Sequence, residues 1–349
     1  MKWEENVRKV VPYVAGEQPN RPNMIKLNTN ECPYPPAPGV RKAAENMESA
    51  ALRLYPNSNA QPLVDELAAY YGVKPEQVFV GVGSDDVLSM AFLTFFNSGK
   101  PVLFPDVTYS FYDVWADLYR IPYHTCALDE NWHMNPEDYK QPNGGVIFPN
   151  PNAPTGVEES QAMIEEILQA NPDVVVIVDE AYVDFGGTSA LPLLKKYENL
   201  LVVQTFSKSR AMAGMRIGNE KLIHYLNDVK FSFNSYTMNL PSQVMGVEAV
   251  KDDAYFKATT AKIAATRERI KKELNELGFT FPDSKANFIF ASHKEVPAEE
   301  LFRALREADI YVRHWNKPRI ANSLRITVGT DEEMDRLIAF LKNYLEKRA

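Results

Sequence analysis

Short segments of uninterrupted apolar residues, separated by segments with helical periodicity, constrain the fold of this chain more than any other feature. The apolar segments are residues 78–80, 101–104, 145–148, 174–178 and 200–203. A strand with one face in water alternates polar and apolar residues, whereas an uninterrupted run is typical of a strand that helices cover on both faces. After the first run, a helical period places apolar side chains at Val87, Leu88, Ala91, Phe92 and Phe95. The pattern predicts an α/β fold with a mostly parallel sheet, whose functional groups gather at the carboxyl ends of the strands.

The chain has 349 residues, which is too long for one simple core, so we expect a large and a small domain. Prolines at 12, 19 and 22 break any helix in residues 1–30, which we interpret as an N-terminal arm. Residues 31–245 then form the large domain and residues 246–349 a small α+β domain. In the small domain we expect one long helix from about 241 to 277, strands at 286–290, 311–313 and 323–328, and helices at 297–308 and 331–347.

Composition excludes several classes of function. The formal charge is −8, with 38 basic and 46 acidic residues and no cluster of Lys and Arg, which argues against nucleic acid as a partner. No run of about eighteen apolar residues is present, so no membrane span is expected. The charged N-terminus lacks the apolar stretch of a signal peptide. The two cysteines, Cys32 and Cys126, form no paired motif and no zinc-binding motif occurs, so we expect a cytoplasmic protein without metal.

Lys208 follows the apolar run 200–203, and Arg216 lies eight residues later beside a glycine. An amine held dry at the end of a buried strand can form a Schiff base. The alternative is an ordinary solvated lysine, which is the more common case for a loop. A cofactor that carries an aldehyde and a phosphate would need both the lysine and the arginine.

Gly81, Gly83, Ser84 and Asp85 follow the run 78–80 and lead into a helix. Backbone N–H groups at a helix start can bind phosphate, and glycine lets the ligand approach closely. The alternative is a plain N-cap at Ser84. The third glycine of the dinucleotide fingerprint is missing, which disfavours a nicotinamide or flavin cofactor.

Asp179 and Tyr182 follow the run 174–178, and Tyr109 follows the run 101–104. A buried aspartate that faces a pyridine nitrogen keeps this nitrogen protonated, although a carboxylate at a strand end often only caps the next turn. Tyr182 is near enough in sequence to donate to a phenolate oxygen on the same ring. Tyr109 is suited to stacking on a planar ligand, although most tyrosines are packing residues.

Six motifs occur in this order: Gly-x-Gly-Ser-Asp, Thr-Tyr, Asn-Pro-Asn-x-Pro-Thr-Gly, Asp-Glu-Ala-Tyr, Thr-Phe-Ser-Lys and Arg-x-Gly. The series resembles the fold-type I pyridoxal-phosphate aminotransferases over essentially the whole chain. The segments 26–31, 54–56, 179–185 and 324–330 are most similar to the histidinol-phosphate aminotransferase branch. The resemblance implies a seven-stranded large-domain sheet and pyridoxal 5'-phosphate as the cofactor.

The resemblance also implies roles for single residues. Lys208 would be the Schiff-base lysine, which substrate releases to act as the base at the Cα proton. Asp179 would face the pyridine nitrogen, Tyr182 would donate to the cofactor's O3′, and Tyr109 would stack on its ring. The cofactor's phosphate would be held by a group at one sheet edge: Gly83, Ser84, Asp85, Ser207 and Arg216. Tyr55 would reach that phosphate from the other subunit, which implies a homodimer.

Substrate recognition would rest on Arg325, with Arg313 as the second choice, because a guanidinium suits a carboxylate or a phosphate equally. Tyr13 is either a group that closes over the substrate or a packing anchor. The branch implies exchange of an amino group between L-histidinol phosphate and 2-oxoglutarate. A threonine-phosphate decarboxylase-like lyase and an aromatic amino-acid aminotransferase share these motifs. A non-enzymatic regulator is disfavoured, since no basic helix-turn-helix segment is present.

The chain departs from the family pattern at two places. Ala153 replaces the asparagine that precedes the proline and contacts O3′, so either Asn152 substitutes for it or Tyr182 acts alone. After Gly218 the usual apolar residues are absent, which indicates a truncated strand or residues missing from the chain. We favour missing residues, because the loss of half a core strand is costly. No role follows for Asn30 and Glu31, and we expect Lys221 and Lys230 to be surface groups.

Overall fold

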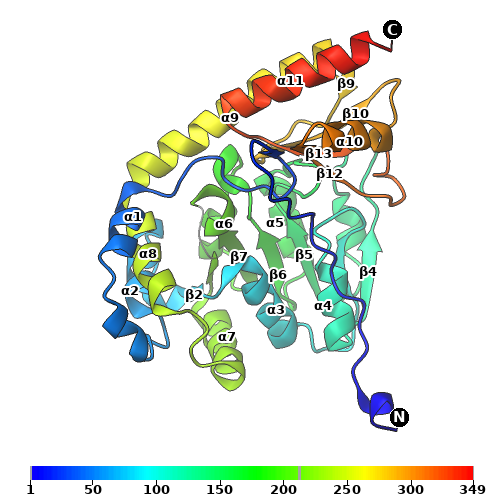
Figure 1. Ribbon diagram of the computed structural model, residues 1–349. Helices are drawn as coiled ribbons and strands as arrows, with labels where there is room; N and C mark the ends of the chain where they lie inside the picture. The colour runs from blue at the N-terminus through cyan, green and yellow to red at the C-terminus, as the bar shows by residue number, and fades with distance from the viewer. Residues whose placement is uncertain (1, 211–213, 349) are drawn as a thin grey trace.

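The computed structural model describes residues 2–210 and 214–348, and it contains a large and a small sheet (Figure 1). The large sheet has seven strands in the order β2-β8-β7-β6-β5-β3-β4. These strands are β2 (Val78–Val80), β3 (Val102–Pro105), β4 (Tyr123–Cys126), β5 (Gly145–Pro149), β6 (Val176–Asp179), β7 (Leu200–Thr205) and β8 (Gly214–Gly218). Six of these strands run in the same direction, and β8 runs antiparallel to both of its neighbours, β2 and β7. The prediction of a mostly parallel α/β sheet is therefore confirmed.

Helices cover both faces of the large sheet, as the uninterrupted apolar runs indicate. One face packs against α3 (Gly83–Phe95), α4 (Tyr112–Tyr119) and α7 (Glu220–Phe233). The other face packs against α5 (Gln161–Ala170). The short helix α6 (Phe206–Ser209) continues directly from β7, and α1 (Pro38–Glu45) and α2 (Gln61–Tyr71) lie at the β2 edge. The carboxyl ends of β5, β6 and β7 therefore open toward the small sheet.

Strand β8 passes directly into α7. Gly218, the last residue of β8, pairs with Leu201, and the side chain of the next residue, Asn219, accepts a hydrogen bond from Lys221 N at 2.9 Å. A Cβ atom on Gly218 would lie 2.6 Å from Leu201 Cδ1, so glycine suits this close approach. The junction has no connecting loop, and whether the chain lacks residues here stays a prediction.

The small sheet has the order β12-β13-β10-β9, and its strands are antiparallel. They are β9 (Phe279–Thr280), β10 (Phe288–His293), β12 (Arg313–His314) and β13 (Leu324–Thr327), with α10 (Ala298–Glu307) and α11 (Asp331–Glu346) packed on them. A separate parallel pair joins β1 (Ile25–Lys26) to β11 (Ile310–Tyr311). The segment predicted as part of the arm thus ends in contact with the small domain.

One prediction about this region is wrong. The expected single helix from 241 to 277 is two helices, α8 (Leu240–Lys251) and α9 (Asp253–Glu276). Asp252 separates them, and its carboxylate accepts a hydrogen bond from Tyr255 N at 3.3 Å as the N-cap of α9. Aspartate favours an N-cap over a helix interior, which accounts for the break. Helix α8 packs on α1 and α2, whereas α9 contacts α11 and β10. The domain boundaries stay a prediction.

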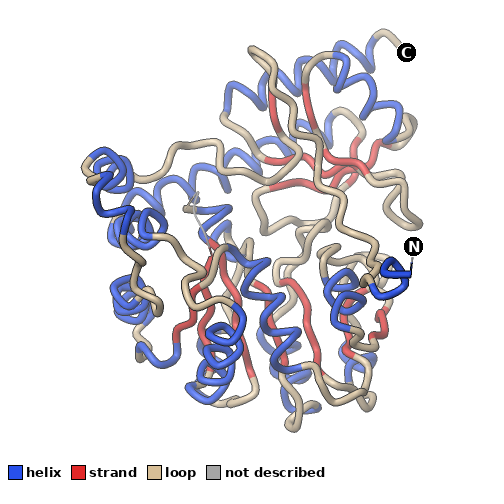
Figure 2. Tube along the Cα trace, turned by 60° about the horizontal axis from the view of Figure 1, so that its bottom comes forward, coloured by secondary structure: helices blue, strands red, loops and turns tan. Residues whose placement is uncertain are grey.

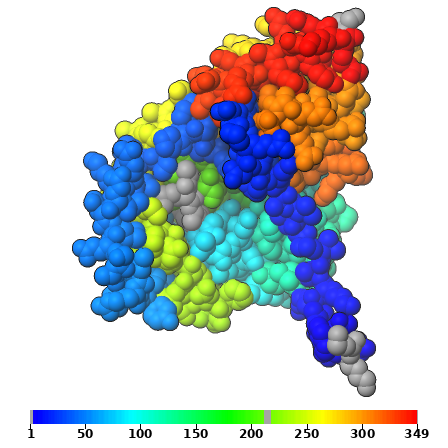
Figure 3. Space-filling view, viewed as in Figure 1, coloured from blue at the N-terminus to red at the C-terminus, as the bar shows by residue number. Residues whose placement is uncertain are grey.

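The N-terminal arm lies across the surface of the molecule (Figures 2 and 3). It runs from the small sheet along α4, where Arg8 donates to Leu118 O and Tyr13 stacks on Phe111. Among the described residues, no helix is long and apolar enough to cross a membrane. Nor does this part of the chain group three His, Cys, Asp or Glu side chains where they would hold a metal ion.

Candidate active site

Most of the predicted cofactor-binding residues line one cavity of about 160 Å³ at the carboxyl ends of β5, β6 and β7. Parallel strands place the residues that follow them at the same sheet edge, so residues far apart in sequence meet there. The cavity is lined by Val82, Gly83, Ser84, Asp85, Tyr109, Pro149, Ala153, Asp179, Ala181, Tyr182, Ser207 and Lys208. All three residues predicted to be catalytic are among them.

Lys208 lies in α6, directly after β7, and its side chain is half-buried. The hydroxyl of Thr205 accepts a hydrogen bond from Ser207 N at 3.2 Å and so caps this short helix. The Lys208 amine donates to Thr29 O at 3.2 Å. The N-terminal segment 26–31 therefore forms part of the wall of the site, although the sequence analysis derived no role for its last two residues.

Asp179, the last residue of β6, is buried, and donors on β6's own continuation and on α4 contact its carboxylate. Its Oδ2 accepts from the Tyr112 hydroxyl at 2.9 Å, and its Oδ1 accepts from Ala181 N at 3.3 Å. Burial and the facing Asp179 raise the pKa of Tyr112 well above its usual range, so this hydroxyl stays a donor. Sequence reasoning missed this contact.

Tyr109 is held in place by a hydrogen bond and by ring contacts. Its hydroxyl donates to Asp85 Oδ1 at 2.7 Å, and its ring lies edge-on to Tyr112 at 5.9 Å between centroids. Burial and the nearby Asp85 raise the pKa of Tyr109 above its usual range. Tyr109 thus presents a fixed aromatic face to the cavity.

Tyr182 is buried, and Asn30 donates from its Nδ2 to the tyrosine oxygen at 2.9 Å. Its ring lies edge-on to Phe288 at 5.0 Å between centroids. Sequence reasoning missed Asn30 as a functional residue, although the residue belongs to the family signature in segment 26–31. The signal was present but had no chemical interpretation without the contact.

Asn152 does not line the cavity; Ala153 does. The Asn152 amide donates to Val107 O and Thr155 Oγ1, both at 3.0 Å, and its Oδ1 has no protein partner. Both NH₂ protons of this amide are thus used by protein acceptors, one in its own loop and one in the segment after β3. The suggestion that Asn152 contacts the cofactor therefore has no supporting contact in the structure.

Arg325 lies on β13 and faces an adjoining hollow of about 350 Å³, which shares Tyr109 and Ala153 with the first cavity. Its Nη2 donates to Asn28 O at 2.9 Å, whereas its buried Nε has no protein partner. Burial of the guanidinium lowers the pKa of Arg325. A buried cation with an unused N–H is suited to an anionic ligand.

Tyr13 and Arg313 differ in whether they line this hollow. Tyr13 lines it and stacks on Phe111 at 4.3 Å between ring centroids. Arg313 is not among its lining residues. The Arg313 guanidinium lies 5.2 Å from the ring of Trp315 and donates to Val14 O at 3.3 Å. The structure therefore brings Tyr13 and Arg325 together and holds Arg313 against the arm.

Tyr55, a predicted phosphate ligand, is not among the residues that line the cavity of its own chain. It is 82% exposed and stacks on Tyr236 at 4.5 Å between centroids. Arg216, a second predicted phosphate ligand, lies on β8, where its backbone pairs with Phe79 of β2 and Val203 of β7; its side chain lies outside the part of the chain that the structure describes.

Lys230 corrects the expectation of a surface lysine. The residue is 1% exposed, and its amine donates to Val80 O at 3.2 Å, just before the loop that begins α3. The α7 face that carries Lys230 packs on β2, which the sequence alone did not indicate. Lys221, by contrast, is on the surface as expected, with its side chain 79% exposed.

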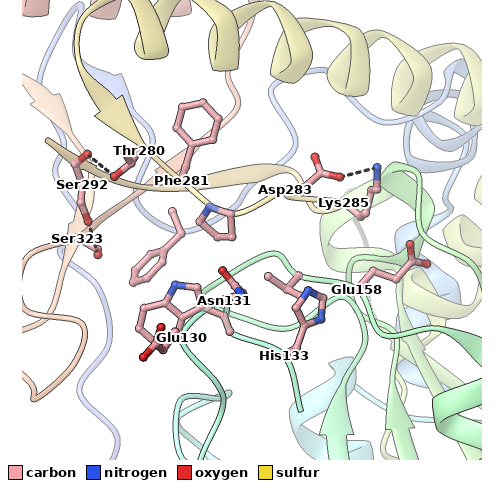
Figure 4. A pocket seen from close by; sticks show the side chains of 14 residues that line it. Glu130, Asn131, His133, Glu158, Thr280, Phe281, Asp283, Lys285, Ser292 and Ser323 are labelled. Atoms are coloured by element: carbon pink, nitrogen blue, oxygen red, sulfur yellow. Dashed lines mark hydrogen bonds and ion pairs between the residues drawn. The ribbon is translucent and has the colours of Figure 1, made fainter. Parts of the chain in front are cut away.

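A larger cavity, of about 590 Å³, lies elsewhere (Figure 4). Its walls are the loop 130–133 of the large domain and residues 280–285 of the small domain, where Asp283 pairs with Lys285 at 3.1 Å. It contains none of the predicted site residues. We assign the active site to the smaller cavity because the reactive side chains converge there.

Comparison with known proteins identifies the family of the chain. Residues 22–341 match the family model for aminotransferase class I and II. The histidinol-phosphate aminotransferase of Lactococcus lactis subsp. cremoris (strain MG1363) is 52% identical over 352 residues, which covers 100% of this chain and 99% of that protein. The protein of the same name from Clostridium botulinum (strain Langeland) is 48% identical over 349 residues, with 99% of both chains covered.

Solved structures show the same fold. The histidinol-phosphate aminotransferase from Clostridium acetobutylicum superposes with a TM-score of 0.85 at 21% identity and covers 93% of this chain and 100% of its own. The enzyme of that name from Sinorhizobium meliloti, in complex with pyridoxal-5'-phosphate, gives a TM-score of 0.83 at 22% identity and covers 93% and 92%.

Proposed function

Since this chain belongs to the family of class I and II aminotransferases, it is a transaminase, and we propose that it moves an amino group between L-histidinol phosphate and 2-oxoglutarate. The observation that carries the proposal is the convergence of Lys208, Asp179 and Tyr182 on one cavity, in a chain 52% identical to a curated histidinol-phosphate aminotransferase. The direction of transfer depends on which substrate is in excess, because the reaction is reversible.

The cavity fits pyridoxal 5'-phosphate as the cofactor. Backbone N–H groups at the start of α3 and the Ser84 and Ser207 hydroxyls suit the phosphate. The Lys208 amine suits the aldehyde, and the flat face of Tyr109 suits the ring. When bound, this cofactor supplies an electron sink for the negative charge that develops at the substrate's Cα atom.

Each remaining residue has a task that its contacts support. The Lys208 amine would take the proton from the substrate's Cα atom. The Asp179 carboxylate, to which Tyr112 donates at 2.9 Å, would hold the pyridine nitrogen in its protonated form. Tyr182 would donate to O3′ without help from Asn152, whose amide donates to Val107 O and Thr155 Oγ1.

Arg325 binds the anionic group of the substrate. The unused Nε of its guanidinium offers a further donor beside the one given to Asn28 O. The phosphate of histidinol phosphate and a carboxylate of glutamate suit this fork equally, so the two substrates use one pocket in turn. Tyr13 closes that pocket from the arm, and Arg313 adds positive charge behind Trp315.

The functional unit is a homodimer. Tyr55 and Tyr236 stack on each other. This contact brings segments 52–55 and 231–236, which both carry exposed apolar side chains, next to each other. Phe233 is 73% exposed within this surface. A contiguous apolar surface of this kind marks a protein interface. Tyr55, which lies outside the cavity of its own chain, reaches the phosphate of the partner's cofactor.

The test is the half-reaction with L-histidinol phosphate alone. Protein loaded with pyridoxal phosphate is mixed with this substrate, and the cofactor absorbance is followed. Conversion to the pyridoxamine form, reversed by 2-oxoglutarate, is expected, and Lys208→Ala slows it by roughly 10⁴-fold or more. An unchanged spectrum with histidinol phosphate but conversion by L-phenylalanine assigns an aromatic substrate. Release of carbon dioxide from threonine phosphate contradicts transamination.

A further inference from the structure

Asn30 lies in a chain of hydrogen bonds that links the small domain to Tyr182. Asn30 N donates to Thr327 Oγ1 at 3.1 Å, and Thr327 Oγ1 donates to Asn30 Oδ1 at 3.1 Å. Asn30 Nδ2 then donates to the Tyr182 oxygen at 2.9 Å. Asn30 is 1% exposed, so water does not compete for these contacts.

The direction of every bond in this chain follows from its first member. A backbone N–H can only donate, so Thr327 Oγ1 accepts from Asn30 N and has its own proton left for Asn30 Oδ1. Because Oδ1 is then the acceptor, the other end of the amide is the NH₂ group, and it donates to Tyr182. The Tyr182 oxygen accepts a hydrogen bond from Asn30, and the tyrosine keeps its own hydroxyl proton for another partner.

That other partner lies in the cavity. Tyr182 lines the cavity, and among the described residues its hydroxyl contacts Asn30 alone. Ala153 lines the same cavity and has no side-chain donor, while the amide of Asn152 donates to Val107 O and Thr155 Oγ1. A cofactor oxygen beside Tyr182 therefore depends on this tyrosine for a hydrogen bond.

We propose that Asn30 is a positioning residue for the transamination, which directs the Tyr182 proton into the cavity toward the cofactor's O3′. The inference rests on the proposed function, because it requires the cofactor to occupy this cavity. Asn30 does not touch the reacting atoms; it acts through Tyr182.

The small domain sets this arrangement. Thr327 belongs to β13, and Asn287, just before β10, donates from Nδ2 to Asn30 O at 3.0 Å. Both contacts hold Asn30 in the left-handed conformation, with a φ of 58° that asparagine and aspartate tolerate. The position of the small domain thereby determines which way the Tyr182 hydroxyl points.

The test is a pH titration of the visible absorbance of the bound cofactor in Asn30→Asp. Aspartate has the same shape and backbone tolerance, but its carboxylate only accepts, so the Tyr182 proton turns toward it and away from O3′. The spectral transition then moves to higher pH by about 1 to 2 units. Thr327→Val frees the Asn30 amide to flip without adding charge, and it is expected to shift the transition in the same direction. Thr327→Ser retains the hydroxyl and the wild-type titration.

Asn28→Asp is the matched control. Asn28 is also buried and lies two residues away, but its Nδ2 donates to Glu17 O at 2.8 Å rather than to Tyr182. The titration of this variant is expected to match the wild type. An equal shift in Asn28→Asp and Asn30→Asp assigns the effect to charge in segment 26–31 and overturns the proposal.

A double-mutant cycle separates the route through Tyr182 from a direct charge effect. In the Tyr182→Phe background, Asn30→Asp is expected to shift the titration by less than half of its effect in the wild type. The same shift in both backgrounds shows that Asn30 does not act through Tyr182. A protein that develops no lysine-dependent cofactor absorbance contradicts the proposed function itself, which is a different result from an unshifted titration.

Discussion

The amine of Lys230 is buried beneath the loop that leads into α3. It donates to Val80 O at 3.2 Å and lies 5.2 Å from the centroid of Phe79. Burial lowers the pKa of Lys230 from 10.5 to about 8, and the nearby Asp86 opposes this shift. A lysine whose pKa falls on folding binds fewer protons in the folded state than in the unfolded state. The free energy of unfolding therefore rises with pH between about 8 and 10.5.

Lys230→Met is expected to remove this rise. Between pH 7 and pH 9.5 the wild-type protein should gain about 2 kcal/mol of stability relative to the variant, measured by urea unfolding at fixed protein concentration. Lys221→Met, at an exposed lysine of the same helix, serves as the control and should parallel the wild type. Parallel curves for Lys230→Met and the wild type would show that the pKa of Lys230 is the same in the folded and the unfolded protein, as for a solvated, charged lysine.

Tyr112 donates to the Asp179 carboxylate, which we propose faces the cofactor nitrogen, so we expect its hydroxyl to contribute to catalysis without contacting substrate. Tyr112→Phe retains the ring within its aromatic cluster and removes one hydrogen bond to a charged group. We expect kcat to fall by about 10-fold with little loss of thermal stability. Tyr139→Phe, at a buried tyrosine on the other face of the sheet, should leave kcat unchanged. Equal kcat values for Tyr112→Phe and the wild type would contradict this role.

At the scale of elements, the junction between β8 and α7 depends on one cap. Asn219 accepts from Lys221 N at 2.9 Å and begins a helix that covers β8 and β2. Asn219→Ala should lower the free energy of unfolding by about 1 kcal/mol, whereas Asn219→Asp keeps the acceptor and adds a favourable charge at the helix start. Urea unfolding of both variants measures the difference. An equally stable Ala variant would show that β8 pairing alone fixes the junction.

The sequence predicted the central strands well because each is apolar along its whole length. β2 occupies 78–80 as expected, and β5 and β7 begin at the predicted residues. It did not predict β4, which is mostly exposed at the sheet edge, or β1, whose two residues form a strand only through β11. Such elements arise from pairing partners distant in sequence, which periodicity does not report.

The sequence also predicted part of the candidate active site. Residues at the ends of strands, such as Asp179 and Lys208, meet because parallel strands share an edge. Asn30 and Tyr112 were missed because their roles depend on a single contact with another side chain. The direction of the Asn152 amide was equally inaccessible, since it depends on the turn that brings Val107 O near.

At the scale of the whole molecule, the proposed dimer with a shared site makes a prediction that hybrids can test. Lys208→Ala and Tyr55→Ala are each expected to be nearly inactive. When they are unfolded together and refolded as a 1:1 mixture, each hybrid dimer has one site with both wild-type residues. Activity should recover to roughly one quarter of the wild-type value. No recovery would place Tyr55 in the site of its own chain or outside the site.

The pairing of Ile25 with Ile310 also has a consequence for the timing of synthesis. The ribosome makes segment 26–31 well before β11 and Thr327, which hold it beside Lys208 and Tyr182; Asn30 and Thr327 are 297 residues apart. At ordinary rates of translation the interval is on the order of tens of seconds. A nascent chain that lacks the small-domain strands therefore contains Lys208 without the wall that orders it. The arrangement delays a competent catalyst until these strands have been made.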